Sequence, residues 1–67
     1  MRKNLYMFRH KHGLTQQAAA DKIGCSRQTY AGIETGRADG RVQFWEDLKN
    51  AFGITDAEKG ELMKKEA

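Results

Sequence analysis

Residues 15–36 read TQQAAADKIGCSRQTYAGIETG and predict two short helices joined by a tight turn. Thr15 and Ser26 suit the N-cap position, where a side-chain oxygen accepts a hydrogen bond from an unpaired backbone N–H of the first turn. Gly24 and Gly36 suit the position just after a helix, because glycine adopts left-handed backbone angles without a steric cost. Each predicted helix therefore has its own start and stop signal.

The second helix of this pair is expected from about Arg27 to Thr35 and has two different faces. Tyr30 and Ile33 lie three positions apart, so we expect them to face the core. The opposite side combines long hydrogen-bonding side chains with very small residues: Arg27, Gln28, Ala31 and Gly32. The first helix, from about Gln16 to Ile23, ends so close to the second that the two must cross steeply, as in a helix-turn-helix unit.

Apolar residues at helical spacing predict helices on both sides of this unit and no strand, so the expected fold class is all-α with five helices. One helix is expected from Lys3 to about His12, followed by Gly13. Another ends before Gly53, and its apolar stripe consists of Val42, Phe44, Trp45, Leu48, Ala51 and Phe52. We expect the large aromatic side chains of this stripe to supply much of the core.

A fifth helix is expected at about residues 56–65. It follows a capping-box pattern, in which Thr55 and Glu58 each accept from the other's backbone N–H. Gly60 inside the helix costs about 1 kcal/mol relative to alanine. Because the apolar side is sparse beyond Leu62 and Met63, we expect this helix to be the least stable one and these two side chains to be candidates for a dimer contact.

Composition and charge fit a single domain, residues 1–67, that binds a polyanion. The net charge is +3, with 39% hydrophobic and 31% charged residues. Residues 1–40 carry seven basic and three acidic side chains, whereas residues 41–67 carry five and six. The half that contains the two-helix unit is therefore the positive half, as a nucleic-acid-binding face requires.

Several classes of protein are disfavoured by the same composition. A chain of this size buries only about 60% of its unfolded surface, which leaves little room for a catalytic cleft. The sequence lacks the apolar run of roughly 20 residues that crosses a bilayer and the pattern of a secretory signal. One cysteine cannot form an internal disulfide, which favours a reducing compartment, so we expect a cytoplasmic location.

Cys25, His10 and His12 are the residues that suggest a metal site or a catalytic nucleophile. A zinc site needs three or four ligands, and two histidines two positions apart on a helix point in different directions. Catalysis by Cys25 would require a base and an orienting group, which the spacing does not supply. We therefore expect no metal, no cofactor, no small-molecule substrate and no enzymatic activity, with Cys25 acting as a small buried hydrophobe.

A combination of residues at fixed spacing resembles one known family. The combination is Arg9, Leu14-Thr15-Gln16, Ala20, Gly24, Ser26-Arg27-Gln28-Thr29 and Ile33-Glu34-Thr35-Gly36. It is similar to the Cro/repressor-type helix-turn-helix DNA-binding domains, the Xre-like or lambda-repressor-like family, over roughly residues 5–54. The resemblance implies a compact five-helix lambda-repressor-like domain whose second and third helices form the helix-turn-helix. It also implies a DNA-binding transcriptional regulator, a small prophage-type or mobile-element repressor that acts as a homodimer on an operator.

The resemblance assigns roles to individual residues. Arg27 and Gln28 match base-reading positions of the third helix in the major groove, and their side chains can bind guanine and adenine bidentately. Ala31 could touch a thymine methyl, whereas Gly32 stands where relatives often carry a long polar side chain. The expected contacts to the DNA backbone are Gln16 or Gln17, Ser26, Thr29, Arg37 and Arg41. Arg9 and Glu34 match an internal ion pair between the first and third helices.

A second hypothesis is a protein-interaction module, or an antitoxin-type partner, that retains the same fold. The missing side chain at Gly32 and the modest net charge are compatible with this alternative. Binding to duplex DNA across a salt series separates the two, because a DNA-binding protein loses affinity steeply as salt increases.

Overall fold

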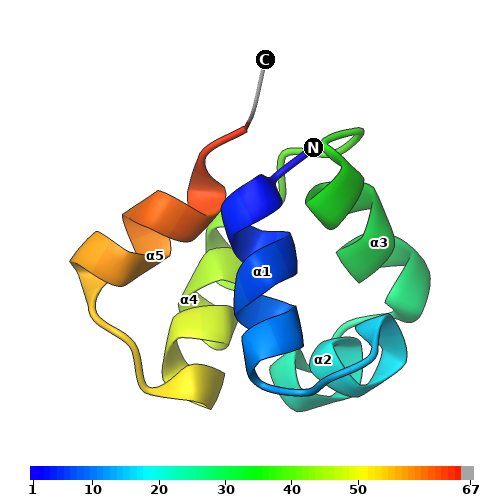
Figure 1. Cartoon of the computed structure of the whole chain (residues 1–67), viewed down its shortest axis with the longest axis horizontal. Coiled ribbons are helices and arrows are strands. Elements are labelled where there is room, and N and C mark those ends of the chain that lie inside the picture. The colour runs from blue at the N-terminus through cyan, green and yellow to red at the C-terminus, as the bar shows by residue number, and fades with distance from the viewer. Residues whose placement is uncertain (66–67) are drawn as a thin grey trace.

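The computed structural model describes residues 1–65 and contains five helices and no strand within that range. The helices are α1 Lys3–Lys11, α2 Gln16–Ile23, α3 Arg27–Thr35, α4 Val42–Phe52 and α5 Asp56–Met63. This confirms the predicted all-α class; α1 ends slightly earlier than expected, and α5 ends at Met63 rather than near residue 65. Positions 66–67 of the predicted domain lie outside the described residues. In Figure 1, α1 lies between α5 on one side and the α2–α3 pair on the other.

Side-chain caps define the starts of three helices. The hydroxyl oxygens of Thr15, Ser26 and Thr55 each accept a backbone N–H three residues later, at 3.0, 3.1 and 3.1 Å. The capping box is complete, because Glu58 Oε1 also accepts from the backbone N–H of Thr55 at 3.3 Å. Gly24 and Gly36 end α2 and α3 with positive φ angles of 98° and 89°. Helix α4 differs, since its N-cap residue Arg41 makes no side-chain cap hydrogen bond.

The core lies where all five helices meet. Tyr30 and Ile33 are both 1% exposed, which confirms that this side of α3 faces inward. The remaining buried apolar residues are Leu5, Ala19, Ala20, Ile23, Phe44, Trp45, Leu48 and Leu62. Phe52 is only half-buried and packs edge-on against Phe8, with ring centroids 4.9 Å apart.

Leu62 corrects one expectation about α5. The side chain is 6% exposed and belongs to the core, so it is not available for a dimer contact. The reason is that α5 folds back and packs against α1 and α4, and Leu62 is the side chain that it buries there. Met63 is 40% exposed.

Arg2 is a buried anchor that the sequence did not indicate. It is 3% exposed, and its guanidinium donates to four backbone carbonyl oxygens. The acceptors are those of Met63 at 3.0 Å, Ile33 at 2.6 Å, Ala38 at 2.8 Å and Asp39 at 3.1 Å. Its backbone N–H donates to Glu34 O at 2.8 Å. Through these hydrogen bonds, Arg2 links the end of α3, the loop that follows it and the end of α5.

Candidate nucleic-acid interface

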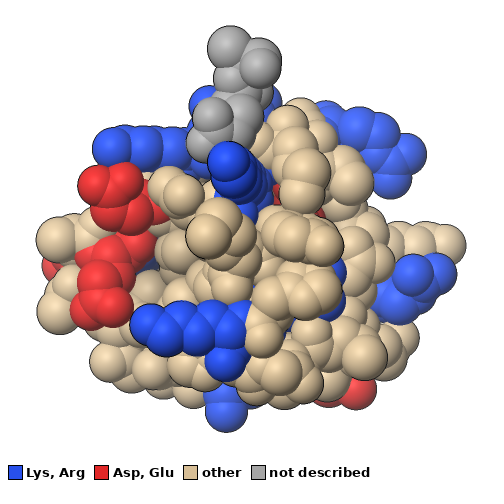
Figure 2. Space-filling view, viewed as in Figure 1, with Lys and Arg blue, Asp and Glu red and all other residues tan. Residues whose placement is uncertain are grey.

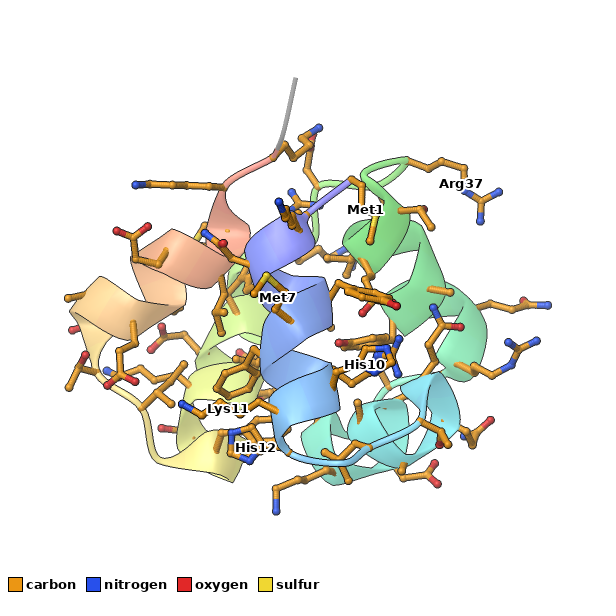
Figure 3. The ribbon with its side chains drawn as sticks, in the orientation of Figure 1. Met1, Met7, His10, Lys11, His12 and Arg37 are labelled. Carbon is orange, nitrogen blue, oxygen red and sulfur yellow. The ribbon has the colours of Figure 1, made fainter. Side chains whose placement is uncertain are left out.

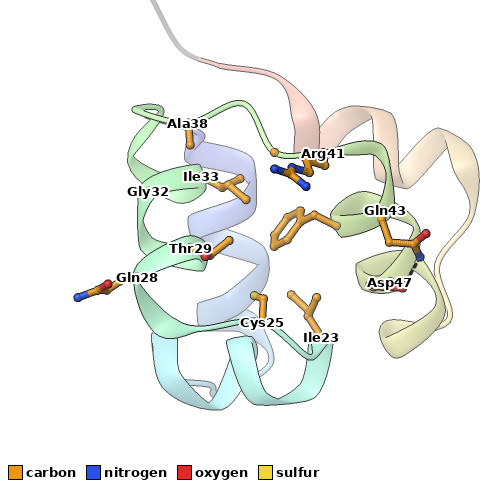
Figure 4. A pocket seen from close by; sticks show the side chains of 12 residues that line it. Ile23, Cys25, Gln28, Thr29, Gly32, Ile33, Ala38, Arg41, Gln43 and Asp47 are labelled. Carbon is orange, nitrogen blue, oxygen red and sulfur yellow. Dashed lines mark hydrogen bonds between the residues drawn. The ribbon is translucent and has the colours of Figure 1, made fainter.

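The N-terminal half of α3 presents two long polar side chains to solvent. Arg27 and Gln28 are both exposed, and Figure 4 shows Gln28 pointing away from the body of the domain. Among residues 1–65, neither side chain has a hydrogen-bonding or ionic partner. The Ser26 cap fixes the backbone at this end, so both side chains project from a defined position and are free to bind an external ligand.

Ala31 and Gly32 lie further along α3 and differ from the expected exposed face. Ala31 is half-buried, and Gly32 is buried. The expectation that Gly32 lies on the exposed side is therefore wrong. The physical reason is the loop after α3, which folds back so that the backbone N–H of Ala38 donates to Gly32 O at 3.0 Å.

Two exposed arginines lie in the segment that connects α3 to α4. Arg37 projects from the loop after α3 (Figure 3), and Arg41 stands at the start of α4. Neither forms an ion pair with any residue that the structure describes. In Figure 2, basic side chains project from the side formed by α3, whereas most of the acidic atoms in view gather over α5. Basic side chains also project over α5 and from the middle of this view, so the acidic groups are more localised than the basic ones.

The two glutamines at the start of α2 are held differently. Gln16 is half-buried, and its Nε2 donates to Glu34 Oε2 at 2.8 Å. Gln17 is exposed, and its Nε2 donates to Asp21 Oδ1 at 2.8 Å. Each amide nitrogen carries two N–H groups, so each side chain keeps one further donor. The internal bond orients the amide of Gln16, whereas that of Gln17 is tied only to its own helix.

Ser26 and Thr29 share one hydrogen-bonding arrangement. Ser26 Oγ accepts the backbone N–H of Thr29, and the two hydroxyl oxygens are 2.9 Å apart. Because one hydroxyl donates to the other, a single O–H of the pair remains available for an external acceptor. Both residues are exposed.

Glu34 connects the three helices behind this surface. Its carboxylate is buried and accepts from Arg9 Nε at 2.9 Å and from Gln16 Nε2 at 2.8 Å. The Tyr30 hydroxyl lies 3.5 Å from Oε1. Burial and the neighbouring Glu34 charge raise the pKa of Tyr30 well above its usual range, so the phenol stays protonated. The ion pair between Arg9 and Glu34 expected from the sequence is present, and the link from Gln16 extends it to α2.

The residues considered for metal binding or catalysis pack as ordinary side chains. His10 packs at a tilt against Tyr6 and His12 against Phe8, with ring centroids 4.3 and 4.4 Å apart, and Figure 3 places the two histidines on different sides of α1. Cys25 is half-buried, and burial together with Asp47 raises the pKa of its thiol. Since the thiolate is the nucleophile, this shift lowers its reactivity.

Two absences hold for residues 1–65. No three His, Cys, Asp or Glu side chains lie close enough together there to hold a metal ion. No helix in the same range has the length and apolarity needed to span a membrane.

Comparison with known proteins agrees with this geometry. A family model described as a helix-turn-helix domain matches residues 4–62. The chain is also 37% identical, over 54 residues, to a Methanocaldococcus jannaschii protein named as an uncharacterized HTH-type transcriptional regulator; the match covers 81% of this chain and 82% of that protein. No solved structure matches the chain significantly. The chain therefore belongs to the Xre-like helix-turn-helix family.

Proposed function

We propose that this protein is a sequence-specific regulator of transcription that binds double-stranded DNA, with residues 1–67 acting as one domain. The observation that carries the proposal is the pair of exposed side chains Arg27 and Gln28 at the capped start of α3, which have no partner among residues 1–65. In a helix-turn-helix protein this end of the second helix meets the base edges in the major groove. Arginine pairs bidentately with guanine and glutamine with adenine.

The residues around α3 supply donors for phosphates. Arg37 and Arg41 lack an acidic partner among the described residues, and the amide of Gln16 has a second N–H beyond its bond to Glu34. The exposed groups that complete this set are Gln17 and the Ser26–Thr29 hydroxyl pair. Such contacts fix the protein on the duplex and carry no sequence information. Ala31, half-buried, adds at most a methyl contact to a thymine.

A homodimer on a two-fold symmetric operator follows from the same family. One domain contacts a half-site, and relatives of this kind place two recognition helices about 34 Å apart. The outer face of α5 lies on the opposite side of the molecule from α3 (Figure 1), so a partner there leaves α3 free for DNA. Met63 is 40% exposed, but it lines a hollow with Gly40, Val42 and Trp45, so it lies toward the start of α4. We infer that the regulator is a repressor of the prophage or mobile-element kind, which acts by occupying its operator.

Selection of bound duplexes from a random pool tests the function, followed by fluorescence anisotropy on the selected site. Gln28→Ala is expected to cost about 1–3 kcal/mol at one base position and to relax the preference there. Asn50→Ala, which removes an exposed amide from α4, is the matched control and should bind as the wild type does. A two-fold symmetric selected site would indicate that the protein binds as a dimer.

Arg37→Ala should weaken binding to all duplexes alike and reduce the slope of log K against log salt by about one unit. Lys64→Ala, an exposed cation beyond α5, serves as its control. If the wild type shows no salt-dependent binding to any duplex, the proposal is wrong, and a protein partner becomes the better explanation of the exposed α3 surface.

A further inference from the structure

The outer side of α1 carries apolar side chains that face solvent. Met7 is 55% exposed and Tyr6 is 38% exposed. Tyr6 is held in place, because its ring centroid lies 4.3 Å from that of His10 and 5.5 Å from the guanidinium carbon of Arg9. A large side chain that is already ordered loses little conformational freedom when a partner covers it. Tyr6 and Met7 therefore suit the apolar centre of a contact with another molecule.

The charged residues around this apolar centre are basic. Lys3 and Lys11 stand four positions before and after Met7, and both are exposed. Residues four apart share one side of a helix, so Met7 lies between two cations. Neither lysine forms an ion pair with any of residues 1–65, and the first acidic residue of the chain is Asp21. Figure 3 shows Met7 and Lys11 on α1 at the front of the view.

The neighbouring flank of α5 has the opposite charge. Helix α5 packs against α1, and Asn4 Nδ2 donates to Glu61 O at 3.1 Å. Lys59 faces α4, where it pairs with Glu46. Helical spacing therefore places Glu58 and Glu61, which are both exposed, on the other flank, toward α1. Figure 2 shows acidic atoms of α5 on the face of the molecule that carries α1.

The basic side of α1 and the acidic flank of α5 make this face complementary to itself. In a two-fold dimer the same surface of both copies meets, so α1 of each copy lies against α5 of the other. Lysines and carboxylates then face one another twice across the axis. Glu61 already pairs with Lys64 at 2.9 Å, but both side chains are exposed, and such a pair is weak enough to be exchanged.

We propose that a second copy of this chain binds to this face, with Met7 near the centre and Lys11 of each copy against Glu61 of the other. This inference deepens the homodimer of the proposed function, on which it rests for the direction of α3. In Figure 3, α3 and Arg37 project to a different side from Met7, so α3 stays accessible. A two-fold axis parallel to the direction in which α3 faces leaves both α3 helices on the same side, as one duplex requires.

A second exposed apolar group provides the matched control. Val42 is 81% exposed and lines the hollow that also contains Met63. The charged residues of that hollow are Arg2, Asp39 and Lys59, and each already has a partner within the chain. The hollow therefore offers a partner apolar area without the charge complementarity of the α1 face.

Sedimentation equilibrium without DNA compares the two surfaces. Met7→Asp is expected to weaken dimerisation about tenfold or more, because a carboxylate would be buried at the centre of the contact. Val42→Asp introduces the same charge at the other surface and should dimerise within about threefold of the wild type. Circular dichroism verifies that each variant is folded.

Charge reversal tests the pairing of α1 with α5. Lys11→Glu and Glu61→Lys should each weaken self-association, because like charges then face one another across the axis. In an equal mixture of the two variants, each reversed side chain meets an opposite charge in the other copy. The mixed dimer should therefore form at least about tenfold more tightly than either variant pairs with itself.

The outcomes keep this inference distinct from the proposed function. The inference is wrong if the wild type stays monomeric at every concentration, if Val42→Asp rather than Met7→Asp prevents dimerisation, or if mixing the reversed variants restores nothing. Salt-dependent binding to the selected duplex, with any of these results, would leave the proposed function intact. A wild type that dimerises as described but binds no duplex would support the inference and contradict the function.

Discussion

The interior charges around Glu34 and the surface charges between α4 and α5 are organised in opposite ways. Glu34 is 2% exposed, and the donors Arg9 and Gln16 converge on its carboxylate from two other helices. On the surface, Lys49 pairs with Asp56 at 2.9 Å and Lys59 with Glu46 at 2.5 Å. When a buried charge loses its partner, water cannot reach it to replace the lost interaction, whereas water solvates an exposed charge. The interior network should therefore act as a unit and the surface network as weak, separate pairs.

Glu34→Ala should produce the largest effect. It leaves Arg9 buried without a counter-charge, which costs about 3–5 kcal/mol of unfolding free energy. Urea unfolding followed by circular dichroism measures the loss. The double variant Arg9→Met with Glu34→Leu should recover part of it, since an apolar replacement of both charges leaves no unpaired charge. A loss below about 1 kcal/mol in Glu34→Ala would show that the interior charges do not act as one network.

Arg2→Ala tests whether a buried cation bonded to carbonyl oxygens behaves like one bonded to a carboxylate. Four carbonyl oxygens lose their donor, so we expect a loss of about 2–4 kcal/mol. Lys3→Ala, next in the chain and exposed, should change stability by no more than about 0.5 kcal/mol. Equal effects of the two substitutions would show that the four hydrogen bonds contribute little.

Lys59→Ala examines the surface network. The side chain of Lys59 is half-buried and bridges Glu46 and Asp56, and we expect a loss of no more than about 1 kcal/mol, as for other ion pairs at a protein surface. The difference from the wild type should shrink at high salt, where such charges are screened. A larger loss of stability that persists at high salt would show that the surface ion pairs behave like the interior network around Glu34.

The pH dependence of Asp56 should be the smallest effect. The hydrogen bond and charge of Lys49 lower the pKa of Asp56 from its ordinary value of 3.8. Its contribution is therefore present above that pH and disappears as the pH falls through the lower folded pKa. Thermal unfolding of Asp56→Asn and of the wild type should differ at about pH 6 and converge near about pH 2. If the stabilities of the two proteins differ by the same amount at both pH values, ionisation of the Asp56 carboxyl group is not the cause of the difference.

The sequence predicted most of the local structure correctly. Caps such as Ser26 and stops such as Gly24 act within one helical turn, so their signals lie in neighbouring residues. The inward direction of Tyr30 and Ile33 follows from helical spacing alone. The five helices and the exposed polar start of α3 could therefore be predicted from short-range patterns.

Four residues were missed or misplaced for a common reason. Arg2 bonds to carbonyl groups at positions 33, 38, 39 and 63, and Gln16 bonds to Glu34. Gly32 is buried by the loop after α3, and Leu62 packs into the core. Each outcome depends on a partner in another helix or loop, which local periodicity does not identify.

The sequence by itself determined the helices, their caps and the polar face of α3, because these depend on residues a few positions apart. The tertiary structure decided which polar groups are held inside, as with Gln16 on Glu34. It also buried Gly32, whose carbonyl oxygen accepts a hydrogen bond from the backbone N–H of Ala38 in the loop after α3. Whether one element covers another depends on how the elements pack together, and residues a few positions apart do not determine it.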